Sequence, residues 1–135
     1  MEIVKARPVR KGPADTFVGD AWIEDVAGRD RPGSRIRVGL VRFAPGARNA
    51  WHAHSLGQTL RVLEGVGRTQ ARGGPVTEMR AGDTVIAEPG EWHWHGAAPD
   101  HFMAHLAMWE VPADGTETEW GEPVSDAEYR AGDKI

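Results

Sequence analysis

The chain has 135 residues, no cysteine, a net charge of −4 at pH 7 and a sequence pI of about 5.8. This acidic balance argues against a nucleic-acid partner, because proteins that bind the phosphate backbone need a basic face. No apolar run reaches the roughly 18 residues of a membrane helix, and the first residues lack the apolar core of a signal peptide, so we expect a cytoplasmic protein with no membrane partner. Without cysteine, a metal ion would be held by nitrogen and oxygen donors.

Short β-strands separated by turns are predicted over most of the chain, which has the size of a single domain covering residues 1–135. Seventeen glycines and nine prolines divide the apolar stretches at the spacing typical of a β-sandwich or barrel. The strands are expected at Phe17–Val26, Ile36–Phe43, Ala50–His54, Gln58–Glu64, Gly67–Arg72, Val76–Met79, Thr84–Ala87, Trp92–Gly96 and Met103–Val111. The fold class is therefore all-β, and a single barrel is the simplest architecture.

The two ends of the chain are expected to differ from this pattern. A small basic cluster is predicted to be a solvated, partly mobile N-terminus: Arg7, Arg10 and Lys11. Near the C-terminus, Ser125 is followed three residues later by Glu128, which is the capping-box pattern of a helix start. We predict a short helix there that ends by Gly132.

Histidines recur in two pairs with one residue between the partners of each pair. His52 and His54 project to the same side only in an extended strand, whereas on a helix they would diverge by about 200°. His93 and His95 repeat the same alternation later in the chain. Such pairs can be ordinary strand histidines that are hydrogen-bonded in a sheet or a core. The glycines and the proline around them instead favour two strands that offer imidazoles to one metal ion.

The residues around these histidines resemble the two sequence motifs of the cupin family. The first motif, two glycines that flank two histidines and a glutamate, falls on Gly46, His52, His54, Gln58 and Gly65. The second motif, two glycines followed by a histidine, falls on Gly82, Gly90 and His93. The chain departs from the family pattern at three positions. Gln58 takes the place of the glutamate in the first motif. In the second motif, Glu88 stands where a proline is usual, with the proline displaced to Pro89, and Ala97 stands where an asparagine is usual.

The motifs span Gly46 to Ala97, and apolar strand patterns extend the resemblance over residues 16–111, which leaves residues 112–135 as a C-terminal extension. The resemblance implies a cupin double-stranded β-helix, or jelly-roll, barrel with a short C-terminal helix. It also implies that four metal ligands project inward from neighbouring strands: His52, His54, Gln58 and His93.

The glutamine in this ligand set affects the chemistry that is expected of the metal. A neutral amide leaves a divalent ion with its full charge, which favours Lewis-acid chemistry over redox chemistry. Alternatively, Gln58 hydrogen-bonds a strand neighbour and the site has three ligands. A set of histidine and glutamine donors accepts Mn²⁺, Fe²⁺, Co²⁺, Ni²⁺, Cu²⁺ or Zn²⁺.

Two further histidines are candidates for catalysis. His95 shares the predicted face of His93 and is expected in the pocket as a hydrogen-bonding residue. His105 lies on an apolar strand, where burial would keep its imidazole neutral and able to accept a proton. The alternative for His105 is a core histidine bonded to a backbone carbonyl. His101 lies in a predicted turn and is expected to be exposed.

Three stretches are similar to the small bacterial cupins that act as manganese-dependent hydroxynitrile lyases: Trp51–Leu60, Gly90–Ala97 and Met103–Ala107. This resemblance implies Mn²⁺ as the metal, and reversible cleavage of a small-molecule cyanohydrin to an aldehyde and cyanide. It implies the acid/base role for His105, and we expect the metal and His95 to hold the developing anion. Two other functions remain open, an Fe²⁺-dependent dioxygenase and a non-catalytic cupin that binds a small molecule or holds a structural metal.

The expected substrate pocket is lined by Val41, Phe43, Met103 and Trp109, with Trp109 narrowing it. Trp92 and Trp94 alternate with the second histidine pair, so they should face away from the metal, against a second sheet or a subunit. Either they form an intramolecular core or, as the resemblance implies, they belong to the interface of a homodimer or homotetramer. Trp120 is expected to attach the C-terminal extension to the barrel.

Overall fold

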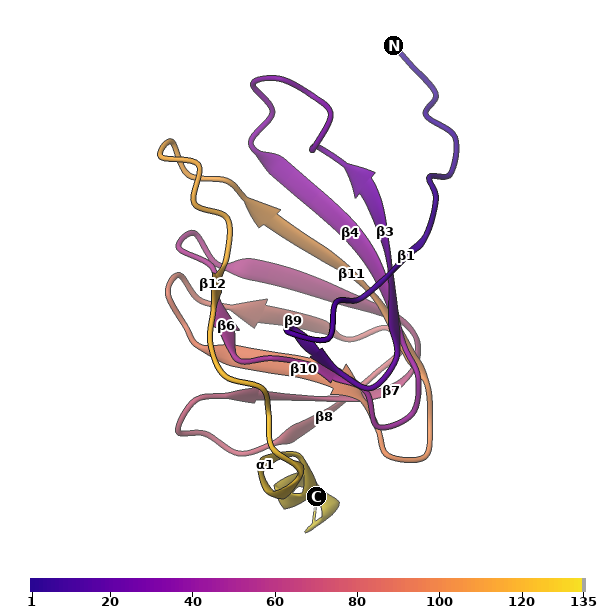
Figure 1. The fold of residues 1–135 in the computed structure, drawn as a ribbon, viewed down its shortest axis with the longest axis vertical. Coiled ribbons are helices and arrows are strands. Elements are labelled where there is room, and N and C mark those ends of the chain that lie inside the picture. Colours follow the sequence, from indigo (N-terminus) through magenta and orange to yellow (C-terminus); the bar gives the residue numbers. More distant parts are fainter. Residues whose placement is uncertain (135) are drawn as a thin grey trace.

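The strands of the computed structural model, which describes residues 1–134, form one antiparallel sheet that curls into an open barrel (Figure 1). Its twelve strands are β1 (Arg10–Lys11), β2 (Phe17–Val18), β3 (Ala21–Ala27), β4 (Ile36–Phe43), β5 (Arg48–Asn49), β6 (His52–Ala53), β7 (Gln58–Ala71), β8 (Thr77–Arg80), β9 (Thr84–Ala87), β10 (His93–Ala97), β11 (Met103–Glu110) and β12 (Glu119–Trp120). The predicted all-β class is confirmed.

The curled sheet has two layers that share strand β7. The first layer has the order β1-β3-β4-β11-β7-β9, and the second has the order β2-β5-β10-β7-β8. In the second layer, β6 also pairs with β10, and β12 pairs with β6. β7 changes layer near Gly65, where a φ of +82° and the lack of a side chain let it pass against the carbonyl of Phe102. Because β7 belongs to both layers, its inward side chains reach the space between them.

The strand prediction differs from the structure in two regions, and the two-residue strands β1, β5 and β12 were not predicted. The expected strand over residues 17–26 is divided into β2 and β3, because a turn at Gly19, with a φ of +79°, sends its two halves into different layers. The expected strands over residues 58–64 and 67–72 are one continuous strand, β7, since the bend at Gly65 does not end the pairing.

The C-terminal helix, α1 (Asp126–Arg130), begins at the predicted capping box. The Ser125 hydroxyl accepts the backbone N–H of Glu128 at 3.1 Å, and the Glu128 carboxylate accepts the backbone N–H of Ser125 at 3.0 Å. The helix ends at Arg130, and a 3₁₀ turn continues over Ala131–Lys134. Within residues 1–134, no helix has the length and apolar character that crossing a lipid bilayer requires.

The C-terminal segment is held on the second layer by Tyr129. The guanidinium groups of Arg48 and Arg68 lie over the Tyr129 ring, 4.6 and 5.0 Å from its centroid, and the Tyr129 hydroxyl donates to the carbonyl of Ala97. This segment covers Trp94, which is fully buried. For Trp94 the intramolecular alternative is therefore correct, and its ring is not available to a second subunit.

Candidate metal centre and active site

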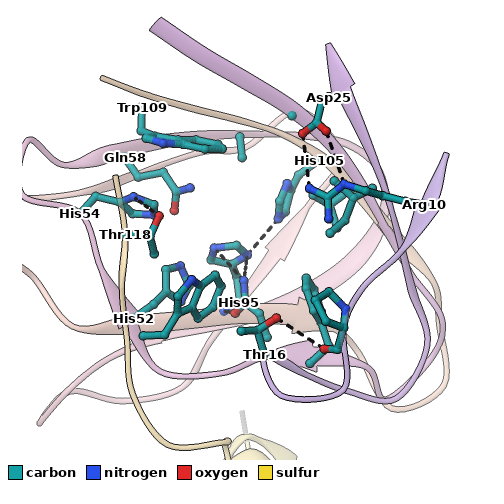
Figure 2. Close-up of a pocket in the computed structure, with 18 of the residues that line it drawn as sticks. Arg10, Thr16, Asp25, His52, His54, Gln58, His95, His105, Trp109 and Thr118 are labelled. Carbon is teal, nitrogen blue, oxygen red and sulfur yellow. Dashed lines mark hydrogen bonds and ion pairs between the residues drawn. The ribbon is translucent and has the colours of Figure 1, made fainter. Parts of the chain in front are cut away.

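A cavity of about 430 Å³ opens between the two layers of the barrel (Figure 2). Its uncharged polar side includes His52, His54, Gln58, His95 and His105. Its apolar side includes Phe17, Ile23, Val41, Ala107, Trp109 and Trp120. Imidazoles and one amide therefore meet a mostly apolar wall, in a space of the size that binds small organic molecules.

The two predicted histidine pairs lie close together, and three of the four rings, those of His52, His54 and His95, line this cavity. His52 lies directly opposite His93 across β6 and β10, and both are buried. One ring nitrogen from each of His52, His93 and His95 lies within 4.8 Å of the others. The His54 ring is adjacent, with its centroid 5.3 Å from that of His52 and 6.0 Å from that of His93. We call His52, His54, His93 and His95 the imidazole cluster.

Three members of the imidazole cluster make the same hydrogen bond at Nδ1. The acceptors are the backbone carbonyls of Ala50 for His52 at 2.7 Å, Glu117 for His54 at 3.1 Å and Glu91 for His93 at 2.9 Å. A carbonyl oxygen only accepts, so Nδ1 of each ring carries the proton and Nε2 carries the lone pair. Histidines that bind metals commonly have this arrangement. His95 differs, because both of its ring nitrogens face the side chain of Asn49.

The Nε2 lone pairs of these three rings are available to a hydrogen-bond donor or to a cation. Nε2 of His54 is buried and has no hydrogen-bond partner within the described chain. Nε2 of His93 lies 3.1 Å from Oε1 of Gln58, so the ring lone pair and the amide oxygen can face the same cation. The side chains of His52, His54, Gln58 and His93 therefore fit a divalent metal ion, although such donors do not select one metal.

Burial keeps the imidazole cluster uncharged. Desolvation lowers the pKa of His52 well below its ordinary value of 6.5, and the nearby His93 lowers it further. Desolvation also lowers the pKa of His93, and it lowers the pKa of His54 to about 4, against the opposing effect of its bond to the Glu117 carbonyl. Metal binding requires neutral imidazoles, and this cluster supplies them at pH 7.

A second hydrogen-bond network begins at His95, a member of the imidazole cluster, and includes His105 and Asn49. Nε2 of His105 is 2.9 Å from Nδ1 of His95, and Figure 2 shows the two rings pointing toward one another. The amide nitrogen of Asn49 is 3.2 Å from Nδ1 and 3.3 Å from Nε2 of His95. Oδ1 of Asn49 accepts the backbone N–H of His95 at 2.9 Å. The structure thus places His95 between Asn49 and His105.

The His95–His105 pair is enclosed and neutral. Burial lowers the pKa of His105 to about 4. Burial also lowers the pKa of His95 well below its ordinary value, and the neighbouring His105 adds to this effect. The Phe43 ring packs against both imidazoles, with centroid distances of 5.3 Å to His105 and 6.3 Å to His95. The pair is therefore uncharged at neutral pH.

The sequence profile described as "Cupin domain" matches residues 39–109, more than half of the chain. The chain belongs to the cupin family. This cupin is 48% identical over 120 residues to a protein named (R)-mandelonitrile lyase from Granulicella tundricola, covering 89% of this chain and 90% of that protein. A solved cupin-like protein from Thermotoga maritima has a TM-score of 0.86 at 35% identity, over 98% of this cupin and 97% of that chain. A polyketide cyclase from Streptomyces resistomycificus, at 16% identity and a TM-score of 0.70 over 96% of this cupin and 91% of that chain, shares the fold alone.

The C-terminal segment of this cupin, which lies outside the family match, covers the imidazole cluster. β12 pairs with β6 so that Trp120 lies opposite His52, with ring centroids 4.8 Å apart. The carbonyl of Glu117, in the same segment, accepts the bond from His54. From the first layer, Trp109 packs on the His54 ring at 5.4 Å. Trp120 thus attaches the extension to the barrel as predicted, and its contact is the cluster itself.

Two of the four expected pocket residues line the cavity and two do not. Val41 and Trp109 line it. The prediction is corrected for Phe43 and Met103, which pair across β4 and β11 and are buried in the core, 1% and 0% exposed. Strand alternation predicts which side a residue faces, but it does not predict how far along the barrel the residue lies.

The N-terminal segment adds a charged rim that the sequence did not reveal. Arg10 and Arg29 both contact Asp25, at 3.4 and 3.3 Å. Burial raises the pKa of Asp25, but its bonds to the two guanidinium groups outweigh this effect and lower it. Arg10 is exposed, as predicted, and its side chain also contributes to the lining of the cavity. With Asp15, the lining holds two arginines and two aspartates, whose formal charges cancel.

Asn49 is the other site residue that the sequence analysis missed. It is buried on β5, opposite Phe17, and reaches His95 because β5 pairs with β10. Two features of the sequence could have drawn attention to Asn49. It is the only asparagine in the chain, and it lies three residues before His52.

Proposed function

We propose that this cupin is a metal-dependent lyase that reversibly cleaves a cyanohydrin into an aldehyde and cyanide. The observation that carries the proposal is the pair of neutral, buried imidazoles, His95 and His105, which line the same cavity as His52, His54 and Gln58. A substrate hydroxyl can lose its proton to a base that lies beside a cation site in a mostly apolar cavity. The 48% identity to a protein named (R)-mandelonitrile lyase, over 90% of its length, supports this reaction.

The proposed metal ligands are His52, His54, Gln58 and His93. His95 stays outside this set, because its two ring nitrogens face Asn49 and His105. The proposed metal is Mn²⁺, and Fe²⁺, Zn²⁺, Ni²⁺ or Co²⁺ suit the same donors. When bound, such an ion supplies positive charge that stabilises negative charge developing on a substrate.

His105 is the proposed acid and base. Its Nε2 faces His95, whereas its Nδ1 is enclosed in the protein. In the cleavage direction His105 takes the hydroxyl proton, the O–H electron pair forms the second bond of the carbonyl, and the bond to the nitrile carbon breaks. Cyanide leaves with that bonding pair and takes the proton from His105. The reaction is balanced without an oxidant or a reductant.

The cavity favours a neutral substrate with an apolar or aromatic group. The charges of its lining cancel, and Val41, Ala107, Trp109 and Trp120 form an apolar wall. Its volume of about 430 Å³ is within the range of pockets that enclose small organic molecules. A neutral aryl cyanohydrin such as mandelonitrile belongs to the class of substrates that we propose.

Metal analysis and cleavage of (R)-mandelonitrile, measured on the same metal-defined samples, test this proposal. We expect manganese at about one ion per chain, and loss of both the metal and the cleavage in His52→Ala. His101→Ala is the matched control, because His101 is exposed and lies outside the cavity. A stoichiometric metal without cleavage would refute the lyase, and failure to take up metal under any loading would refute the metal centre.

Neither alternative function has an observation in its favour. The common iron centre of dioxygenases combines two histidines with a carboxylate, and the grouped ligand residues found in the described part of the chain are all histidines. Oxygen uptake that requires Fe²⁺ would support that alternative. A ligand that raises the melting temperature without being turned over would support the binding function.

We further propose that the protein forms a homodimer or homotetramer through the outer face of the first layer. Trp22, Ile36, Leu63 and Ile86 are exposed there, between 40% and 65%, on β3, β4, β7 and β9. Exposed apolar side chains on one sheet face are typical of subunit interfaces. Light scattering should give the mass of a dimer or tetramer for the unmodified chain and a smaller mass for Ile86→Lys, and a monomeric unmodified chain would refute the proposal.

A further inference from the structure

Residues 112–123 form a strap that runs from the end of β11, past β6, to the buried Val124 (Figure 1). None of these residues is buried, whereas Val124 is 1% exposed. Among the described residues, the backbone of the strap pairs only with β6 and with Trp51, whose N–H donates to the carbonyl of Glu122 and whose carbonyl accepts the N–H of Gly121. A segment with so little burial and pairing opens at a lower free energy than the strands of the barrel.

The strap contacts two of the proposed metal ligands. The carbonyl of Glu117 accepts Nδ1–H of His54 at 3.1 Å, and the hydroxyl oxygen of Thr118 lies 3.4 Å from the same nitrogen (Figure 2). The Trp120 ring lies 4.8 Å from the ring of His52. Thr118 and Trp120 also line the cavity. The strap is therefore both a wall of the site and the support of His54.

His54 depends on the strap more than the other proposed imidazole ligands do. Nδ1–H of His52 donates to the carbonyl of Ala50, and Nδ1–H of His93 donates to the carbonyl of Glu91, in each case two residues earlier in the chain. These acceptors stay in place when the strap moves, because they belong to the same short stretch as the ring that they orient. Opening of the strap would thus free the His54 ring and leave the other two rings oriented.

The carboxylate of Glu117 attaches the strap to the first layer. It forms ion pairs with Nε of Arg37 at 3.3 Å and with Nη1 of Arg29 at 3.4 Å. Arg37 lies on β4, and Arg29 follows β3. The side chains of Arg37 and Glu117 are 15% and 27% exposed, so dissolved salt reaches these ion pairs and weakens them. The residue whose carbonyl supports His54 is thus the residue whose side chain fixes the strap.

We propose that the strap opens locally while the barrel stays folded, and that this opening, restrained by the ion pairs of Glu117, sets the rate at which a bound metal ion leaves. With the strap open, His54 loses its hydrogen-bond acceptor and its ring can turn away from the site. Loss of such a partner typically lowers metal affinity about 10- to 100-fold. The opening is a property of the chain alone, whereas its effect on the metal rests on the ligand set of the proposed function.

Amide hydrogen exchange of the metal-free protein tests the opening itself. The amides of Trp51 and Gly121 are protected by the strap, and they should exchange faster than the amides of β11. In Glu117→Gln, which keeps the backbone carbonyl, we expect their exchange to accelerate about 2- to 30-fold, the range for two partly exposed ion pairs. Glu119→Gln is the matched control, because Glu119 is exposed on the same strap and has no ion pair within residues 1–134. Equal exchange in the two variants would overturn the proposal.

Release of manganese from the loaded protein into excess EDTA tests the effect on the metal, with the bound manganese measured after gel filtration at increasing times. We expect Glu117→Gln to release the metal faster by the same factor as its amides exchange, and Glu119→Gln to match the unmodified chain. Sodium chloride should accelerate release from the unmodified chain and not from Glu117→Gln. A rate that rises in proportion to the EDTA concentration would show that the chelator removes the metal through the cavity, which would overturn the proposal.

A disulfide across β6 and β12 gives the opposite perturbation. Ala53 and Glu119 lie directly opposite each other, and such antiparallel pairs have Cα atoms about 4.5–5.5 Å apart, which a disulfide can span. The chain has no cysteine, so Ala53→Cys with Glu119→Cys forms one defined bond. Oxidation should slow manganese release at least about 10-fold, and reduction should restore it; an unchanged rate would overturn the proposal. Failure of the unmodified chain to take up manganese would instead refute the proposed metal centre, with hydrogen exchange still testing the strap.

Discussion

The metal-free protein is expected to lose stability as the pH falls from 7 to 5, because its imidazoles are buried without charge. Burial lowers the pKa of His54 and His105 to about 4, from an ordinary value of 6.5 that the unfolded chain retains. Below pH 6.5 the unfolded chain binds protons that the folded chain does not bind, so the free energy of unfolding decreases with falling pH. This contribution is present in full above pH 6.5 and is lost by about pH 4.

The size of the effect follows from these two pKa values. Between them, each histidine contributes a slope that approaches about 1.4 kcal/mol per pH unit. At pH 5 this amounts to about 2 kcal/mol for each of His54 and His105, and about 4 kcal/mol for the two together. Burial lowers the pKa of His52, His93 and His95 as well, so they act in the same direction. A loss of about 4 kcal/mol is a large fraction of the roughly 5–15 kcal/mol that stabilises a typical domain.

Urea unfolding in the presence of EDTA, followed by tryptophan fluorescence between pH 8 and pH 5, measures this dependence. The slope should be smaller by up to about 1.4 kcal/mol per pH unit in His105→Gln, whereas His101→Gln, at an exposed position, should retain it. A free energy of unfolding that changes by less than about 1 kcal/mol between pH 7 and pH 5 would refute the reasoning. Bound metal should raise the free energy of unfolding at pH 7, because the ion competes with protons for the same imidazoles.

Three further substitutions test the site and the segment that covers it. His105→Ala should lower kcat for (R)-mandelonitrile about 10²- to 10⁴-fold with unchanged metal content, and metal loss in this variant would contradict its role as a base. Trp109→Ala should raise kcat/KM for cyanohydrins bulkier than mandelonitrile relative to mandelonitrile itself, and an unchanged ratio would show that Trp109 does not narrow the cavity. Tyr129→Ala should cost about 3–5 kcal/mol in urea unfolding, and a cost below about 1 kcal/mol would contradict its role in holding the C-terminal segment.

The parts of the site that could be predicted from the sequence depend on neighbouring residues. The alternation of His52 with His54 and of His93 with His95 requires only the geometry of an extended strand, and it brings all four rings close together. The capping box at Ser125 is also a local pattern, and the helix begins there.

The parts that escaped prediction depend on pairing between distant strands. Asn49 reaches His95 only because β5 pairs with β10, and Arg10 lines the cavity only because β1 pairs with β3. The inward facing of Phe43 and Met103 was predictable, but their depth in the barrel depends on the register of β4 against β11. Register is decided by the packing of the whole barrel, and no short stretch of sequence contains it.

The contact of Trp120 with His52 has a consequence for the order of events during protein synthesis. His52 and His54 leave the ribosome well before Glu117 and Trp120, which hold and cover their rings in the folded chain. The complete donor arrangement therefore forms only after Glu117 and Trp120 have been synthesised. The ion that enters should be one that is abundant where folding ends, since these donors alone bind several divalent metals. The supply of metal at that moment would then decide which ion the protein carries.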